Sequence, residues 1–260
     1  MSADHILVED AGGIRTITLN RPERKNALTE EMRQRFCGLL SAAERDSAVR
    51  ALIVTATDPV FTAGVDFNEV ARQAPSAGTY DAQFAVNPGS ALRAMSKPVI
   101  AAVNGACVSG GLEIALSCAF IVASERARFA DTHARLGVVA MWGLTALLPR
   151  AVGIRKAREM SVTGNFVAAD DALRIGLVNH VVAHDDLGPF TRALAGQIPD
   201  LPSVSETLLL YARGHSVSLA DALALEAQHT ARRGFDAAAF GERGRDTAAR
   251  HKTVPGKPRK

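Results

Sequence analysis

Short blocks of apolar and polar residues alternate along the first 185 positions and predict strands and helices in turn. Two stretches of alternating hydrophobicity, residues 6–8 and 14–19, flank Gly12-Gly13 and predict an opening β-hairpin. Mostly apolar runs of strand length predict strands at residues 51–56, 99–103, 120–123 and 177–182, with a shorter strand at 128–130. Strand–strand–helix units therefore recur, as in an α/β protein.

Apolar positions at helical spacing follow several of these strands. Thr29 is a good N-cap for a helix over about residues 30–46, whose apolar side chains fall on one face. Gly164 is a suitable stop for another helix at 153–163. Residues 73–90 contain Pro and Gly with weak periodicity, which predicts an irregular binding loop or a disordered segment. Further helices are expected near residues 67–71, 90–95, 111–118, 143–149 and 168–175.

The strand pattern ends at Val182, and residues 186–250 have the periodicity of helices alone. Breaks are expected at residues 199–202 and at Gly214. The apolar stripe over residues 220–230 is too narrow for a separate core, so it should pack on the main domain or on another subunit. We expect a core over residues 1–195 and a helical oligomerisation region with a basic tail over residues 196–260.

Composition places this chain of 260 residues among ordinary soluble globular proteins, with 47% hydrophobic and 22% charged residues. The net charge of +3 comes from the tail, because residues 241–260 hold seven Lys/Arg and two Asp/Glu. With no basic stripe elsewhere and 5% aromatic residues, a nucleic-acid partner is not expected. The polar start is unlike a signal peptide, and no apolar run reaches the roughly 20 residues of a membrane span.

The cysteines carry information about compartment rather than chemistry. The chain has three cysteines, Cys37, Cys107 and Cys118, an odd number that cannot all pair within the chain, and their spacing is not that of metal ligands. We therefore expect reduced thiols in a cytoplasmic protein, and we expect no metal site.

The segment 104–113, Asn-Gly-Ala-Cys-Val-Ser-Gly-Gly-Leu-Glu, is the most informative part of the chain for chemistry. A buried strand should run into a glycine turn that opens a helix, and such a turn presents N–H groups where negative charge can develop. Glu113 falls in the first turn of that helix. An anion hole with a carboxylate beside it suits acyl or enolate chemistry, although Gly-Gly can also serve tight packing alone.

A series of motifs in fixed order resembles the crotonase, or enoyl-CoA hydratase/isomerase, superfamily over about residues 5–185. Each motif is weak by itself, but their order and spacing are specific. The motifs are Ile17-Thr18-Leu19-Asn20-Arg21-Pro22-Glu23-Arg24-Lys25-Asn26-Ala27-Leu28, Phe61-Thr62-Ala63-Gly64-Val65-Asp66, Lys97-Pro98-Val99-Ile100-Ala101-Ala102-Val103-Asn104-Gly105, Ser109-Gly110-Gly111-Leu112-Glu113, Phe129-Ala130-Asp131, Leu148-Pro149-Arg150, Met160-Ser161-Val162-Thr163-Gly164 and Gly176-Leu177-Val178-Asn179.

The resemblance implies a spiral of ββα units with a helical C-terminal region that forms trimers, often paired as hexamers. It also implies an acyl-CoA thioester substrate and no cofactor beyond the coenzyme A of that substrate. The positions that match the two oxyanion donors are the backbone N–H groups of Val65 and Gly110. Positions that match substrate-binding or coenzyme A-binding segments are Ala63, Asp66, Phe67, Asn68 and Arg24, of which Arg24 is equally consistent with a solvated loop cation.

The chain departs from the family pattern at one catalytic position. Family hydratases use two glutamates; the first matches Glu113, and the second is replaced by His133. An imidazole can exchange protons near pH 7, so His133 is expected to assist proton transfer, with a structural role as the alternative. Asp131, two residues earlier on an expected strand, would point the same way and orient His133. Trp142 would line the acyl pocket or pack in the core.

The leading hypothesis is a lyase that adds water to a trans-2-enoyl-CoA, with Glu113 positioning the water. The missing second carboxylate leaves two other crotonase reactions open, namely double-bond isomerisation and thioester hydrolysis. A protein that binds acyl-CoA without turnover is the hypothesis from another class. The sequence leaves open the acyl chain length and the choice between trimer and hexamer.

Overall fold

Between residues 51 and 130, successive strands of the chain enter two β-sheets in alternation. The computed structural model describes residues 4–73, 86–234 and 236–253. In the larger sheet the strand order is β1-β2-β3-β5-β7-β10, and all neighbours are parallel except the β1/β2 hairpin. Its strands are β1 (Ile6–Ala11), β2 (Ile14–Leu19), β3 (Ala51–Ala56), β5 (Val99–Val103), β7 (Phe120–Ser124) and β10 (His180–Val182).

The smaller sheet collects the short strands that follow β3, β5 and β7. Its order is β4-β6-β8-β9, with β4, β6 and β8 parallel and β9 antiparallel to β8. Three successive windings, β3–β4, β5–β6 and β7–β8, thus each add one strand to each sheet before the next helix, which confirms the predicted α/β spiral of ββα units. The strands are β4 (Val60–Thr62), β6 (Ala106–Val108), β8 (Arg128–Ala130) and β9 (Val167–Ala168).

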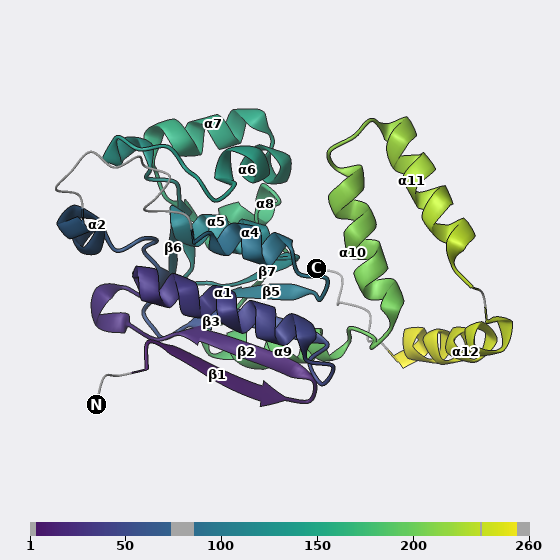
Figure 1. Ribbon diagram of the computed structural model, residues 1–260. Coiled ribbons are helices and arrows are strands. Elements are labelled where there is room, and N and C mark those ends of the chain that lie inside the picture. Colours follow the sequence, from purple (N-terminus) through teal and green to yellow (C-terminus); the bar gives the residue numbers. More distant parts are fainter. Residues whose placement is uncertain (1–3, 74–85, 235, 254–260) are drawn as a thin grey trace. The chain divides into compact units, whose positions relative to one another are not determined.

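Helices cover both faces of the larger sheet (Figure 1). α9 packs on β3 and β5 and buries Ile53 and Ile100 with them. The neighbouring residues Leu52 and Val54 point to the opposite face, into the core shared with Phe36 of α1. Because side chains alternate across a strand, burial on both faces requires the continuous apolar runs from which these strands are predicted.

The α-helices of the core unit begin and end near the predicted positions, and three short 3-10 helices that were not predicted lie between them. They are η1 (Pro22–Arg24), α1 (Glu30–Arg45), α2 (Phe67–Gln73), α4 (Pro88–Arg93), α5 (Gly110–Ser117), η2 (Ala134–Leu136), α6 (Leu144–Val152), α7 (Ile154–Thr163), α8 (Ala169–Arg174), η3 (His184–Asp186) and α9 (Leu187–Gly196).

Helix caps explain where several helices start and stop. Thr29 Oγ1 accepts a hydrogen bond from Met32 N (3.2 Å), which confirms the predicted cap of α1. Gly164 ends α7 with a φ of +62°, as expected for a left-handed C-terminal residue. Residues 74–85 of the predicted irregular segment lie outside the described ranges. α4 already begins within that segment because Asn87 Oδ1 accepts from Ser90 N (2.8 Å).

Three predictions of local structure are wrong. β4 and β6 are three-residue strands in segments whose neighbouring glycines, Gly64 for β4 and Gly105 and Gly110 for β6, predict turns. The strand predicted over residues 177–182 is confined to His180–Val182, because Leu177 and Val178 donate to Ala172 O and so belong to the end of α8.

Beyond Val182 the described residues form helices without further strands, as predicted. The chain divides into two compact units, Met1–Leu209 and Leu210–Lys260. No residue of α11 is buried, and the side chains described for residues 236–247 are not buried either, so the described part of the second unit has no core of its own. No helix in the described ranges is long and apolar enough for a membrane span. The C-terminal helices are α10 (Pro202–Gly214), α11 (Leu219–Arg232) and α12 (Ala237–Thr253).

Candidate active site

The turn after β6 opens α5 and presents the first N–H of that helix. Ser109 adopts a φ of +49°, which is rare for a residue with a side chain and bends the chain sharply between strand and helix. Its Oγ accepts from Thr132 N (3.0 Å) and lies 2.7 Å from Thr132 Oγ1. These bonds hold the turn so that the N–H of Gly110 points out of the helix end, as a helix N-terminus requires.

A second bend, between β4 and α2, lies directly against the first. Gly64 has a φ of +89°, and a Cβ at this position would lie 3.0 Å from Gly110 N. Leu28 N donates to Gly64 O (2.8 Å) and Leu28 O accepts from Asp66 N (3.0 Å). Val65 N–H takes part in neither of these hydrogen bonds. In the described part of the chain, neither Val65 N–H nor Gly110 N–H has an acceptor. The two bends therefore leave two free N–H donors side by side.

Glu113 lies one turn into α5 with only 2% of its surface exposed. Its Oε1 accepts hydrogen bonds from Trp142 N (2.6 Å) and from Leu144 N (3.2 Å), the first residue of α6. Burial raises the pKa of Glu113, an effect that the facing His133 and the two N–H donors oppose and that Asp131 reinforces. The carboxyl is thus oriented by fixed donors and is poised to hold a proton more readily than a solvated glutamate.

His133 faces Glu113 and is held from behind by Asp131. His133 Nε2 lies 3.6 Å from Glu113 Oε2, and His133 Nδ1 donates to Asp131 Oδ1 (2.6 Å). Burial raises the pKa of Asp131, but hydrogen bonds from His133 and Ser161 outweigh it and keep the pKa below its usual value. The ionised Asp131 accepts only, which leaves the proton on Nδ1 and directs Nε2 toward Glu113.

The pairing of Asp131 and His133 arises from a turn rather than from the predicted shared strand. β8 ends at Ala130, and His133 has helical backbone angles at the start of η2. Asp131 Oδ1 also accepts from His133 N (3.1 Å), which closes an Asx turn and brings the carboxylate under the ring. The predicted contact is therefore present, for a different local reason.

These groups line a cavity of about 320 Å³ with a largely apolar wall. Most of the predicted site residues meet here, and Trp142 both lines the cavity and is 1% exposed, with its ring against Gly110. The apolar residues Leu136, Val138, Val139 and Met141 were not predicted as lining residues, because they lie between the recognised motifs and their spacing has no period. The lining residues are Ala63, Val65, Phe67, Val70, Ser109, Gly110, Glu113, His133, Leu136, Val138, Val139, Met141 and Trp142.

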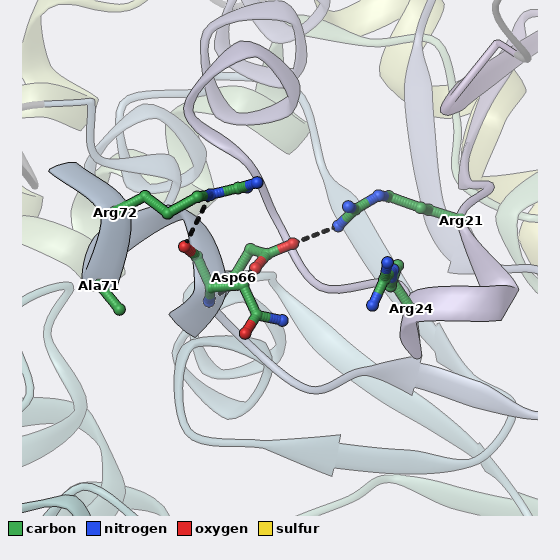
Figure 2. A pocket seen from close by; sticks show the side chains of 6 residues that line it. Arg21, Arg24, Asp66, Ala71 and Arg72 are labelled. Carbon is green, nitrogen blue, oxygen red and sulfur yellow. Dashed lines mark hydrogen bonds and ion pairs between the residues drawn. The ribbon is translucent and has the colours of Figure 1, made fainter.

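Of the four remaining predicted residues, three line a second pocket of about 540 Å³ on the other side of α2, and the fourth, Asp131, lines neither pocket. Arg24, Asp66 and Asn68 line the second pocket with Arg21 and Arg72, and Figure 2 shows the three guanidinium groups around Asp66. The pocket is polar and carries more positive than negative charge, which suits an anionic ligand.

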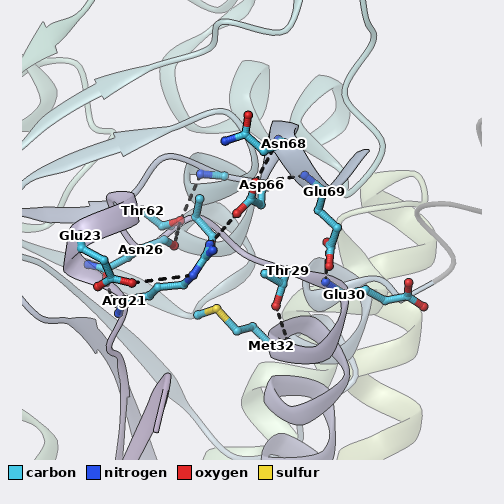
Figure 3. A network of polar contacts seen from close by, with 12 residues as sticks. Arg21, Glu23, Asn26, Thr29, Glu30, Met32, Thr62, Asp66, Asn68 and Glu69 are labelled. Atoms are coloured by element: carbon cyan, nitrogen blue, oxygen red, sulfur yellow. Dashed lines mark hydrogen bonds and ion pairs between the residues drawn. The ribbon is translucent and has the colours of Figure 1, made fainter. Parts of the chain in front are cut away.

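Asp66 serves the architecture of the site more than the pocket. It is 4% exposed, its Oδ2 accepts from Arg21 Nη1 (2.5 Å), and its Oδ1 accepts from the N–H groups of Asn68 (2.9 Å) and Glu69 (3.2 Å). Burial raises the pKa of Asp66, but Arg21 and these N–H donors outweigh that effect, so its pKa lies below the usual value. Figure 3 shows this network, which fixes the start of α2 immediately after Val65. The buried carboxylate thus anchors the bend that presents the Val65 N–H.

The chain is similar to enoyl-CoA hydratases in both sequence and structure. A family model described as enoyl-CoA hydratase/isomerase matches residues 9–240. A short-chain-enoyl-CoA hydratase of Clostridium acetobutylicum is 35% identical over 231 residues, which cover 88% of each chain. The crystal structure of an enoyl-CoA hydratase from Mycobacterium tuberculosis H37Rv aligns with a TM-score of 0.73 and 45% identity, covering 87% of this chain and 97% of that one.

A crystal structure of an enoyl-CoA hydratase from Mycobacterium smegmatis aligns with a TM-score of 0.84 and 33% identity, covering 91% of this chain and 93% of that one. Sequence and fold agree, and the chain belongs to the enoyl-CoA hydratase/isomerase family of the crotonase superfamily.

Proposed function

We propose that the protein adds water across the Cα=Cβ bond of a trans-2-enoyl-CoA thioester. One observation carries the proposal: an oriented, buried carboxylate (Glu113) shares a cavity with two unengaged N–H donors from separate bends. The short-chain-enoyl-CoA hydratase among the relatives supports the same reaction class.

The two pockets on either side of α2 match the two halves of such a substrate. The cationic pocket around Arg24 fits the phosphate groups of coenzyme A, and the apolar cavity fits an acyl chain. Val65 and Phe67 belong to the apolar cavity, while Asp66 and Asn68 border the cationic pocket. The start of α2 would therefore run along the pantetheine between them.

In the proposed reaction, Glu113 takes a proton from a water molecule as its oxygen bonds to Cβ. The π electrons move toward the thioester carbonyl, whose oxygen gains negative charge and is stabilised by Val65 N–H and Gly110 N–H. Donors of this kind are typically worth about 2.7–4 kcal/mol each in the transition state. The N–H groups are fixed before the substrate arrives, so no reorganisation is needed.

His133 protonates Cα in this proposal. The imidazolium donates its Nε2 proton to the enolate carbon and becomes the neutral ring with its remaining proton on Nδ1, toward Asp131. Glu113 then returns the proton taken from water to Nε2 across the 3.6 Å gap, which restores both groups. Proton count and charge balance over the cycle, and Asp131 stays ionised throughout.

A product assay separates this proposal from its competitors. With purified protein and trans-2-enoyl-CoA thioesters of graded length, we expect the conjugated absorbance to fall and the product mass to rise by one water. An unchanged mass would instead indicate isomerisation, and free coenzyme A would indicate hydrolysis. Tight binding without any product over the whole substrate series would favour a binding protein.

The Asp131→Asn variant tests the proposed role of the His133 pair. An amide can donate to Nδ1 and so stabilise the wrong tautomer, and we expect kcat to fall about 10²-fold with little change in KM. Asp58→Asn is a matched control, since Asp58 Oδ2 also pairs with a histidine, His184, at 3.0 Å but does not line the cavity. Equal kcat values for the two variants would remove the Asp131–His133 pair from the mechanism.

We also propose that the C-terminal helices join copies of the chain into a trimer or hexamer. The absence of buried residues in α11 supports this assignment, because an isolated helical unit without a core is marginal. Sedimentation equilibrium would report the mass, and a monomer at micromolar concentration would refute this assignment.

The free thiols of Cys37, Cys107 and Cys118 support a reducing compartment such as the cytoplasm.

A further inference from the structure

Arg93, the last residue of α4, contacts both segments that hold Glu113. Its Nη1 donates to Trp142 O (2.7 Å) and to Ser117 Oγ (3.0 Å), and its Nη2 donates to Ser90 Oγ (3.1 Å). The guanidinium thus connects α4, the end of α5 and the segment that leads into α6. None of the reactions described above uses this side chain.

Two glycines make room for the guanidinium. A Cβ on Gly89 would lie 2.9 Å from Arg93 Nη1 and 2.4 Å from Trp142 O, and a Cβ on Gly143 would lie 2.9 Å from the same Nη1. Gly143 also has a φ of +119°, which disfavours other residues. Only positions without side chains allow this close approach, so the contact between Arg93 and the Trp142 segment is built into the local backbone.

The main chain of Trp142 connects Arg93 to the Glu113 carboxylate. Its carbonyl accepts from Arg93 Nη1, while its N–H donates to Glu113 Oε1 at 2.6 Å. On the second path, Ser117 Oγ accepts from Arg93 Nη1 and donates to Glu113 O (2.7 Å) within α5. Arg93 therefore fixes a donor to the carboxylate and the helix turn that bears it.

We propose that Arg93 is a positioning residue that holds the Glu113 carboxylate in the geometry needed for attack by water. The inference rests on the proposed function for its kinetic consequence, because Glu113 is assigned there as the base. Loss of Arg93 should leave the substrate pockets intact and should free the Trp142 segment, so that Glu113 loses a fixed orientation rather than its presence.

Trp142 is the only tryptophan of the chain and reports on this segment without any enzymatic assay. In the Arg93→Met variant we expect kcat to fall about 10- to 100-fold with KM changed less than about threefold, as for a misplaced catalytic group. Collisional quenching of the Trp142 fluorescence by acrylamide should rise severalfold, since the ring is 1% exposed in the intact protein. Arg93→Lys, which keeps one donor and the charge, should give intermediate values of both.

Arg150→Met is the matched control, because Arg150 Nη1 also donates to a main-chain carbonyl, that of Ala146 (2.6 Å), on the exposed face of α6. Wild-type kcat in Arg93→Met would overturn the proposal, with or without increased quenching. If Arg93→Met does not fold, wild-type kcat in Arg93→Lys would overturn it in the same way, provided that its quenching has increased. A wild-type protein that adds no water would refute the proposed function, whereas the quenching series would still test the coupling of Arg93 to Trp142.

Discussion

Replacement of Glu113 by glutamine should reduce kcat for enoyl-CoA hydration by about 10³-fold, within the range by which a positioned general base accelerates proton transfer. The amide retains an oxygen that can accept from Trp142 N and Leu144 N, so the orientation of the side chain should survive. It cannot take a proton from water, because an amide is not a base near neutral pH. KM should change little, since the thioester oxygen is held by other groups.

The same substitution should leave the fold intact or stabilise it at neutral pH. Burial raises the pKa of Glu113, so the folded state binds this proton more tightly than the unfolded chain does. The resulting stability is complete below the unfolded pKa and is lost as pH rises through the folded pKa. The free energy of unfolding of Glu113→Gln should therefore exceed that of the wild type at pH 7, and this difference should shrink below about pH 4.

Glu44→Gln is the appropriate control for both measurements. The Glu44 carboxylate also accepts from a main-chain N–H, that of Ser96 (3.2 Å), but it is only half-buried on α1 and does not line the cavity. Steady-state kinetics and urea unfolding of the two variants separate loss of the base from loss of a carboxylate. A Glu113→Gln enzyme with more than about a tenth of wild-type kcat would remove Glu113 as the base.

The parts of the site that depend on local sequence could be predicted. The glycine turn, the first turn of α5 and the cap at Thr29 each follow from residues within a few positions of one another, and local chemistry determines their conformation. The buried strands could be predicted as well, because a run such as β5 is apolar on both faces. These elements already bring Glu113 to the edge of an anion site.

Features that depend on contacts between distant residues could not be predicted. Asp66 matches a coenzyme A-binding segment in sequence, yet its carboxylate is bound by Arg21, 45 residues earlier, and by its own helix. The donors that orient Glu113 come from Trp142 and Leu144, in a segment between the recognised motifs. No local pattern encodes such pairings, since the spiral winding alone decides which turns become neighbours.

Adjacent bends make Gly64 the most sensitive position of the oxyanion site. We expect Gly64→Ala to lower kcat/KM for hydration by about 10²- to 10³-fold, the effect of removing one donor from an oxyanion hole. The added Cβ would lie 3.0 Å from Gly110 N and 3.2 Å from Val108 O, both main-chain atoms that cannot rotate away. The two bends must move apart, and Val65 N–H and Gly110 N–H can then no longer reach one oxygen. Stopped-flow loss of the enoyl-thioester absorbance measures the change.

Backbone strain must be separated from this displacement, since alanine at a φ of +89° is itself unfavourable by roughly 1–2 kcal/mol. Gly12→Ala provides that control: Gly12 has a φ of +57° in the hairpin turn, and a Cβ there would meet nothing within 4 Å. Both variants should lose stability in urea unfolding, Gly64→Ala the more, but only Gly64→Ala should lose catalysis. If both retain wild-type kcat/KM, the oxygen of the thioester is not held between these two bends, and the assignment of Val65 and Gly110 as its donors is wrong.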